Sequence, residues 1–174
     1  SKVDFSVANK SYHTLSDHLK RSPSGEIVRK RIDQIQSINW KTLPTYVGED
    51  IYGNQINFND FTGKYVIIDF WATWCQPCVE DMPKLVEISK DYKDSIQVIS
   101  VALDRDVVLC KRKIEELGRQ WRHICTGDAA RGKLPLLFNV QSVPRVVIYD
   151  ENLNLVFDSL NSDEKYDDFL RKKI

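Results

Sequence analysis

Two cysteines that lie three residues apart, directly after an apolar run, restrict the local fold more than any other part of this sequence. The run covers residues 65–71 (YVIIDFW), and Cys75 and Cys78 follow in the segment WCQPC. An almost continuous apolar run of this length predicts a strand that is covered on both faces. The two cysteines then lie where the strand gives way to a helix, with Cys75 at the helix N-terminus and Cys78 one turn further along.

The position of Cys75 predicts a reactive sulfur. The first turn of a helix carries N–H groups that have no partner within the helix, and these groups favour an anion. A thiolate is such an anion, so we expect the pKa of the Cys75 thiol to be lowered and the thiol to react near neutral pH. Cys75 is therefore predicted to be the exposed, attacking sulfur. Cys78 is predicted to be the deeper sulfur that resolves a mixed disulfide and closes a disulfide with Cys75.

A structural metal site is the alternative for two cysteines at this spacing. Zinc in such a site needs four ligands, usually two Cys pairs or a Cys pair with a His pair. The other cysteines and histidines are His13, His18, Cys110, His123 and Cys125. None of them forms a second pair with the usual spacing, so the sequence favours redox chemistry and predicts no metal.

Cys110 and Cys125 are expected to be two separate free thiols that pack as small apolar groups. Counted from Gly118, Cys110 lies about 10–12 Å along the expected helix. Cys125 lies about 20 Å along the strand that follows. This offset exceeds the Cα separation of roughly 7 Å that a disulfide tolerates, so a bridge between them is the less favoured alternative.

The composition excludes several functions. The 174 residues include 25 basic and 25 acidic side chains, so no surplus of charge points to nucleic acid or to an anionic membrane as a partner. The length suffices for one well-buried core and a small extension. No run of eighteen apolar residues is present, and we expect no membrane span.

The N-terminus and the cysteine count say little about the compartment. The chain begins at Ser1 and has no apolar signal core, which is compatible with a mature form or a trimmed one whose targeting segment or N-terminal anchor was removed. Four cysteines are too few for a disulfide scaffold.

Expected strands and helices alternate through most of the chain. The expected strands cover residues 65–70, 96–103, 121–125, 145–149 and 153–157, the last two forming a hairpin, and a further hairpin is expected at 51–56. The expected helices cover residues 75–92, 104–117, 133–138 and 164–172. This alternation predicts an α/β fold with parallel strand pairs that ends in an antiparallel hairpin.

Residues 1–40 differ from the rest and are expected to form a separate N-terminal extension, with one main domain over residues 41–174. Ser22-Pro23-Ser24-Gly25 is expected to break the chain ahead of a single amphipathic helix from about Glu26 to Ser37. Its apolar stripe consists of Val28, Ile32, Ile35 and then Ile38 or Asn39. The stripe either packs the extension on the domain or offers a surface to a second copy or another partner.

Residues 66–83, VIIDFWATWCQPCVEDMP, resemble the active-site segment of the thioredoxin superfamily. They are most similar to thiol–disulfide oxidoreductases of the TlpA/ResA type, whose pattern resembles FWATWCxPCxxEMP. A second match lies downstream at Val143-Pro144, and the resemblance covers roughly residues 41–160. It implies a thioredoxin-like fold with a central mixed sheet flanked by helices, here with an N-terminal helical extension, and thiol–disulfide exchange as the activity.

The resemblance gives roles to two carboxylates. In thioredoxins, an aspartate at the place of Asp69 lies beneath the disulfide and accepts the proton of the resolving thiol. Burial should raise the pKa of Asp69, which suits a general base; the alternative is an aspartate on a strand edge that faces solvent. TlpA/ResA-like proteins commonly carry a glutamate where this chain has Asp81. Its shorter side chain leaves two interpretations, a buried acid or a solvated helix residue.

The resemblance also predicts a substrate-binding rim. The Val143–Pro144 bond is expected to be cis, with Pro144 against the disulfide and the Val143 backbone binding a substrate peptide as an added strand. An ordinary trans proline at a strand start is the alternative. Trp74 is expected to form an exposed apolar rim, and Gln76 and Pro77, between the cysteines, to tune the reduction potential.

By resemblance, the chain is an extracytoplasmic reductase, periplasmic or tethered to a membrane, although a cytoplasmic location stays open. It would keep cysteines of other proteins reduced, apocytochromes c among them, with electrons from a membrane thiol carrier or a thioredoxin. No cofactor is implied.

Two other functions stay open. A peroxidase of the peroxiredoxin or glutathione-peroxidase type shares the fold but does not need a cysteine three residues after the first. A binding module with an inactive dithiol is the other alternative. The direction of electron flow does not follow from the motif.

Overall fold

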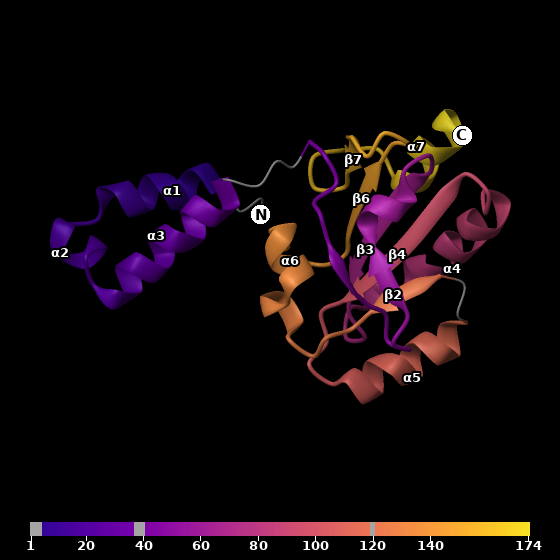
Figure 1. Cartoon of the computed structure of the whole chain (residues 1–174), viewed down its shortest axis with the longest axis horizontal. Coiled ribbons are helices and arrows are strands. Elements are labelled where there is room, and N and C mark those ends of the chain that lie inside the picture. The colour runs from indigo at the N-terminus through magenta and orange to yellow at the C-terminus, as the bar shows by residue number, and fades with distance from the viewer. Residues whose placement is uncertain (1–4, 37–40, 119–120) are drawn as a thin grey trace. The chain divides into compact units, whose positions relative to one another are not determined.

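A computed structural model describes residues 5–36, 41–118 and 121–174 of the chain. The chain divides into two compact units, with the boundary between Asn39 and Trp40 (Figure 1). The expectation that residues 1–40 and 41–174 are separate domains stays a prediction.

The larger unit is built on one mixed five-stranded sheet with the order β5-β4-β3-β6-β7. Parallel pairing joins β3 to β4 and β4 to β5, whereas β6 is antiparallel to both β3 and β7. The strands are β3 (Tyr65–Trp71), β4 (Ile96–Ala102), β5 (Arg122–Ile124), β6 (Arg145–Tyr149) and β7 (Leu155–Asp158). The predicted α/β class and mixed sheet are therefore confirmed, with β3 at the centre.

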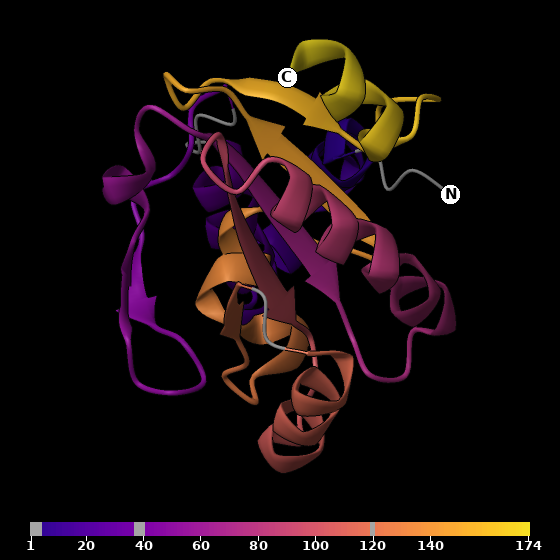
Figure 2. The same ribbon diagram turned by 90° about the vertical axis from the view of Figure 1, so that its right-hand side faces the viewer.

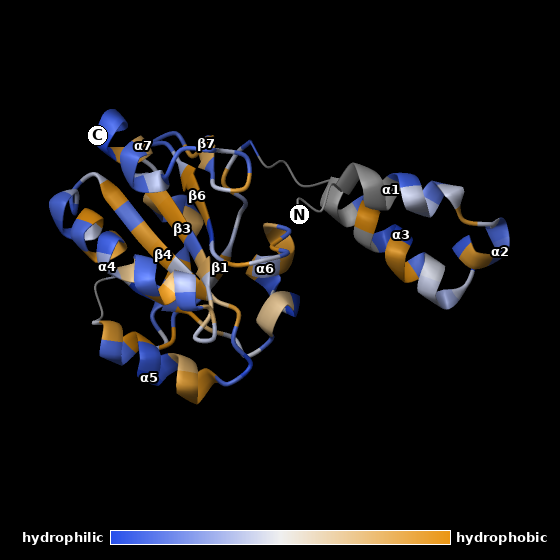
Figure 3. Ribbon diagram, turned by 180° about the vertical axis from the view of Figure 1, so that it is seen from behind, coloured by the Kyte–Doolittle hydropathy of each residue, from blue (hydrophilic) through white to orange (hydrophobic). Residues whose placement is uncertain are grey.

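Helices cover both faces of this sheet (Figure 2). Side chains of α4 (Gln76–Asp91) and α7 (Tyr166–Lys173) share one core with Ile67 of β3. Side chains of α5 (Val107–Leu117) and α6 (Lys133–Leu137) share the other core with Val66 and Ile68. Because alternate residues of β3 serve opposite cores, the strand is apolar along nearly its whole length, as Figure 3 shows in orange.

The hairpin near the start of the larger unit has other bounds than expected. A two-stranded ribbon pairs β1 (Val47–Glu49) with β2 (Gln55–Asn57), so the hairpin spans residues 47–57 instead of 51–56 and closes over a longer turn. The carboxylate of Asp50 holds that turn by accepting hydrogen bonds from the N–H groups of Tyr52 and Asn54. Two 3-10 helices, η1 (Phe58–Phe61) and η2 (Ala129–Arg131), complete the unit.

The smaller unit contains α1 (Phe5–Thr14), α2 (Asp17–Lys20) and α3 (Pro23–Gln36). The prediction of a single helix was wrong. The expected break at residues 22–25 is instead the start of α3 at Pro23, because a proline is tolerated in the first turn and Ser22 caps that turn by accepting the N–H of Gly25.

The expected apolar stripe on α3 is buried at one described position and exposed at another. Ile32 is buried, whereas Val28 is 46% exposed. The side chain of Ile35 and all of residues 37–40, including Ile38 and Asn39, lie outside the described residues.

The separation predicted for Cys110 and Cys125 was wrong, although both thiols are free as expected. The two thiols are joined by a hydrogen bond. β5 begins only at Arg122, so Cys125 lies about 10 Å along the strand direction. Cys110 lies at a similar height, about 12 Å along α5 from its end.

Within the described ranges, no helix combines the length and the apolar character that a bilayer crossing requires.

His123 of β5 is a buried polar residue whose two ring nitrogens have no hydrogen-bond partner. It packs against Trp121, with ring centroids 5.4 Å apart. Burial lowers the pKa of His123 to about 4, although the charge of Asp50 acts in the opposite direction. The folded protein therefore resists protonation of this ring.

We predict that His123 makes the fold less stable as the pH falls from about 6.5 to 4. An unfolded histidine binds a proton near pH 6.5. The folded one binds it only near pH 4, so the unfolded state is favoured in between, by up to about 3 kcal/mol. Urea unfolding at pH 7 and pH 4.5 should give a smaller drop in stability for His123→Phe than for the parent. Equal drops would contradict this account.

Candidate functional site

Cys75 and Cys78 form a disulfide at the start of α4, with their Cα atoms 5.3 Å apart. Cys75 is the N-cap residue of the helix and has an extended backbone. Its sulfur accepts a hydrogen bond from the N–H of Cys78 at 3.3 Å. The predicted placement of Cys75 at the helix N-terminus is confirmed, and its sulfur faces the unpaired donors of the first turn.

The exposure of the two cysteines differs from the prediction. Cys75 is 5% exposed and Cys78 is 4% exposed, so in this disulfide form neither is open to solvent and neither is clearly deeper. Each sulfur covers part of the other because they are bonded. Exposed residues nevertheless lie on both sides of Cys75, since Trp74 is 68% exposed and Gln76 and Pro77 are also exposed. The disulfide therefore lies directly beneath a surface rim.

Asp69 lies in the central strand and is only 7% exposed, so the alternative of a solvent-facing strand edge is wrong. Burial raises the pKa of its carboxyl group to about 7, and the charge of Asp81 adds to the rise, while a hydrogen bond from Ser100 opposes it. A carboxyl group with a pKa near 7 can take up and release a proton at neutral pH.

The sequence did not reveal the hydrogen-bond chain that holds Asp69. The indole N–H of Trp121 donates to Ser100 Oγ at 2.8 Å, and the Ser100 hydroxyl donates to Asp69 Oδ2 at 3.0 Å. Ser100 is fully buried and lies opposite Asp69 in the register of β3 and β4. The one available signal was that Ser100 interrupts an otherwise apolar stretch of β4, just as Asp69 interrupts β3.

Asp81 fits neither of the two interpretations given for it. Its side chain is 33% exposed and pairs with Lys84 at 2.6 Å on the same helix. On its other side it hydrogen-bonds to the buried Tyr166 of α7, which raises the pKa of that phenol together with burial. Asp81 therefore links α4 to α7 and acts on Asp69 through its charge.

The Val143–Pro144 bond is cis, the isomer that the resemblance predicts. Arg145 pairs with Phe70 in the antiparallel register, so this bond lies at the end of β3 that leads to Cys75. Pro144 is exposed and Val143 is half-buried. Among the described residues, no backbone hydrogen bond occupies the N–H or C=O of Val143.

A buried ion pair, not anticipated from the sequence, anchors the strand that follows. The guanidinium of Arg145 binds both oxygens of Asp158 in β7, with the shorter contact at 2.9 Å. Arg145 is 5% exposed and donates a third hydrogen bond to the Phe138 carbonyl. These bonds fix the start of β6 next to the cis bond.

A second unanticipated contact holds the segment between β3 and Cys75. Thr73 donates to the carboxylate of Asp104 through its N–H, at 3.0 Å, and through its hydroxyl, at 2.6 Å. Asp104 was expected to begin a helix, but α5 starts at Val107 with Asp106 as its N-cap. The buried Asp104 instead ties the end of β4 to the approach to Cys75.

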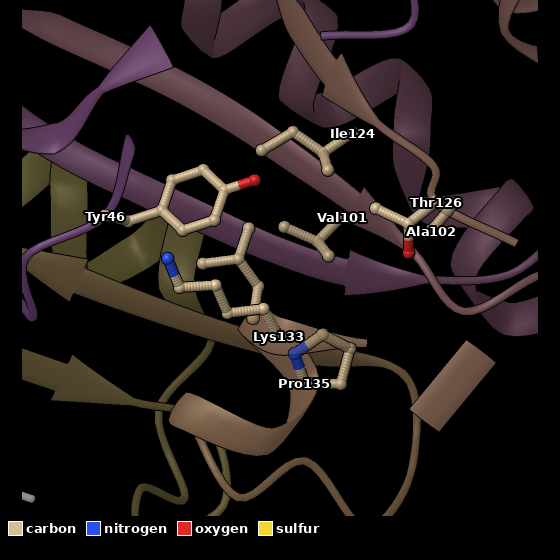
Figure 4. Close-up of a pocket in the computed structure, with 8 residues that line it drawn as sticks. Tyr46, Val101, Ala102, Ile124, Thr126, Lys133 and Pro135 are labelled. Carbon is tan, nitrogen blue, oxygen red and sulfur yellow. The ribbon is translucent and has the colours of Figure 1, made fainter. Parts of the chain in front are cut away.

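One pocket lies apart from these residues (Figure 4). The ends of β4 and β5 and the start of α6 line it, and the Lys133 ammonium lies 5.3 Å from the centre of the Tyr46 ring. None of the predicted site residues lines it. Over residues 5–36, 41–118 and 121–174, no group of three or more His, Cys, Asp or Glu side chains is placed to hold a metal ion.

A family model described as thioredoxin-like matches residues 63–156, which is more than half of the chain. The chain belongs to the thioredoxin-like family. The resemblance noted in the sequence is therefore confirmed at the level of family and fold.

Among the curated proteins, thiol-disulfide oxidoreductases ResA are similar to this thioredoxin-like chain. Those from Bacillus thuringiensis (strain Al Hakam) and Bacillus anthracis are each 33% identical to it over 114 residues, which cover 62% of this chain and 66% of the relative. For another ResA, from Bacillus cereus (strain ATCC 10987), the match covers 44% of each chain at 34% identity. The chain thus spans less than two thirds of the length of these relatives.

Solved structures agree with this fold. The thioredoxin domain of a thiol-disulfide oxidoreductase from Bacteroides vulgatus has a TM-score of 0.67 and 26% identity, with 79% of this chain and 99% of that chain covered. A thiol:disulfide interchange protein from Bacteroides sp. has a TM-score of 0.63 and 27% identity, with 77% of this chain and 88% of that chain covered.

We predict that Asp69→Asn stabilises the protein at pH 8 but not at pH 4. The pKa of Asp69 is about 7 when folded, against 3.8 for the free side chain. The stability that its protonated form contributes is therefore lost as the pH rises from about 4 through 7, a change of about 4 kcal/mol at most. Urea unfolding measures the difference, and the exposed Asp94→Asn is the control. A variant that is no more stable at pH 8 would contradict the assignment.

We also predict that Ser100→Ala raises the pKa of Asp69, because the hydroxyl stabilises the carboxylate form. The infrared carboxyl band should titrate at a pH higher by up to about one unit. Trp121→Phe keeps the Ser100–Asp69 bond and should shift the midpoint less. An unchanged midpoint in Ser100→Ala would show that the hydrogen bond is unimportant.

Proposed function

We propose that this chain is a thiol–disulfide oxidoreductase that exchanges electrons with other proteins through Cys75 and Cys78. One observation carries the proposal, namely a disulfide whose first sulfur caps α4 and accepts an N–H of its first turn. The related proteins named as thiol-disulfide oxidoreductases support it, although the ResA relatives are longer than the matched region.

The proposed reaction begins with the reduced protein. The Cys75 thiolate, stabilised by the N–H groups of the first turn, attacks one sulfur of a substrate disulfide and forms a mixed disulfide. The first substrate sulfur leaves as a thiolate and takes up a proton. Cys78 then attacks the Cys75 sulfur, releases the second substrate sulfur and leaves the Cys75–Cys78 disulfide. Two electrons have passed to the substrate.

We assign Asp69 the role of general base for Cys78 in the second step. Its pKa of about 7 and its burial in the strand that leads to Cys75 support this role. Asp81 would assist by its charge, which raises the pKa of Asp69, and it is held in place by the hydrogen bond with Tyr166. Experiment can separate the two roles. Asp69→Asn should remove the titration near pH 7 from the rate of the second step, whereas Asp81→Asn should keep that titration and shift its midpoint pH.

We propose that an extended segment of the substrate protein binds between the Trp74 rim and Val143. The exposed indole of Trp74 offers apolar contact beside the disulfide. The backbone groups of Val143, unused among the described residues, would pair with the segment as an added strand. Gln76 and Pro77 would contact the substrate between the two cysteines.

The finer assignment rests on the resemblance to the TlpA/ResA type. We propose an extracytoplasmic reductase of protein thiols, with apocytochrome c among its candidate substrates and a membrane thiol carrier or a thioredoxin as the electron donor. Equilibrating the dithiol against a glutathione buffer tests the direction. A potential near −270 mV indicates a reductant, and one near −120 mV indicates an oxidant.

The reduction of insulin disulfides by single cysteine variants tests the activity. We expect Cys75→Ser to abolish turnover, and Cys78→Ser to accumulate the mixed disulfide, because its resolving thiol is missing. Peroxide consumption that survives in Cys78→Ser would favour a peroxidase instead. Absence of turnover in the parent protein would favour a binding module.

We predict that Trp74→Ala lowers kcat/KM for a protein disulfide several-fold but leaves the rate with a small-molecule disulfide nearly unchanged, because only the larger substrate reaches the rim. Val108→Ala is a matched control, since Val108 of α5 is 69% exposed, like Trp74 at 68%. Equal effects of Trp74→Ala on both substrates would argue against a substrate-binding rim.

A further inference from the structure

Cys110 and Cys125 form a second pair of thiols, held by elements other than α4. Cys110 lies in the first turn of α5 and is fully buried, whereas Cys125 follows β5 and is half-buried. Both belong to the core on the α5 and α6 face of the sheet. The thiol of Cys110 donates a hydrogen bond to the sulfur of Cys125.

The loop after Cys125 packs closely against the start of α5. Gly127 comes so near that a Cβ at this position would lie 3.2 Å from Val107 Cγ2 and 3.4 Å from the Arg105 carbonyl oxygen. Its φ of 78° also favours glycine. The N–H of Gly127 donates a second hydrogen bond to the Cys125 sulfur. This packing keeps the two sulfurs in contact.

The two thiols differ in the way that an attacking and a resolving cysteine must differ. The hydrogen bond from Cys110, with that from Gly127, lowers the pKa of Cys125, although burial and the charges of Asp104 and Asp106 oppose it. The same hydrogen bond, with burial, raises the pKa of Cys110. Cys125, the half-buried member of the pair, is thus assigned as the attacking sulfur, and the fully buried Cys110 as the resolving one.

We propose that Cys110 and Cys125 are a second redox-active dithiol, which low-molecular-weight disulfides oxidise to an intrachain disulfide. This site uses cysteines other than Cys75 and Cys78. The fold supplies both requirements, since Cys125 is half-buried and the Cys110 thiol is hydrogen-bonded to its sulfur.

The reaction takes two steps. The Cys125 thiolate attacks one sulfur of a disulfide such as oxidised glutathione, which breaks the S–S bond and releases one glutathione thiolate. The Cys110 sulfur then attacks Cys125, and its proton goes to the second departing glutathione. Two electrons pass from the dithiol to glutathione, whose two halves leave reduced. Bond formation requires the two sulfurs to approach to about 2.05 Å.

The full chain carrying Cys75→Ser and Cys78→Ser isolates this pair. After treatment with oxidised glutathione, acid quenching, unfolding in urea and alkylation, mass spectrometry should show that the protein has lost two hydrogen atoms and that neither Cys110 nor Cys125 is alkylated. Dithiothreitol should restore alkylation at both. Two thiols that stay open to alkylation, or a glutathione adduct that persists on Cys125, would overturn the proposal.

Single variants in the same background test the order of events. Cys110→Ala should stop at a stable glutathione adduct on Cys125, and Cys125→Ala should leave the buried Cys110 unmodified. The opposite pattern would refute the assignment of Cys125 as the attacking sulfur. If a circular dichroism melt shows Cys110→Ala to be unfolded, Cys110→Ser replaces it and keeps the same expected outcome.

Discussion

Helix α4 begins at a cysteine, and the sulfur of Cys75 takes the place that a side-chain oxygen usually occupies at an N-cap. In the disulfide form this sulfur accepts the N–H of Cys78. A thiolate in the same position is a better acceptor, because it carries the charge that the first turn favours. The start of the helix is thus satisfied in both oxidation states, so electron exchange does not require α4 to be rebuilt.

The approach to this helix is held by polar contacts that lie in the interior. Asp104 fixes Thr73 before Cys75, and Arg145 with Asp158 fixes the strand that follows the cis bond. Buried polar groups are costly unless they are paired, so these contacts specify one geometry for the segments around the disulfide. Asp69 differs from these paired groups in its protonation. Burial raises the pKa of its carboxyl group to about 7, so the protonated and ionised forms are both populated at neutral pH.

The sequence pattern predicted correctly those features that are set by residues close together in the chain. The apolar run of β3, the cysteine spacing and the start of α4 follow from short segments, and family resemblance added Asp69 and the cis bond. The rest depends on register and on loop length. Ser100 meets Asp69 across 31 residues, and Thr73 meets Asp104 across the same separation. The Cys110–Cys125 contact was missed because the residues before β5 were counted as part of the strand. The start of α3 was predicted three residues too late because Ser22-Pro23 was interpreted as a break, whereas it begins the helix.

The hydrogen-bond chain from Trp121 through Ser100 has a practical consequence. It ends on a fluorophore, so the electric field at the indole changes when Asp69 gains or loses its proton. The emission of this ring is therefore an intrinsic optical signal for the charge on that carboxyl group. In a variant that keeps Trp121 and lacks the other three tryptophans, stopped-flow spectroscopy could follow proton transfer without any added label.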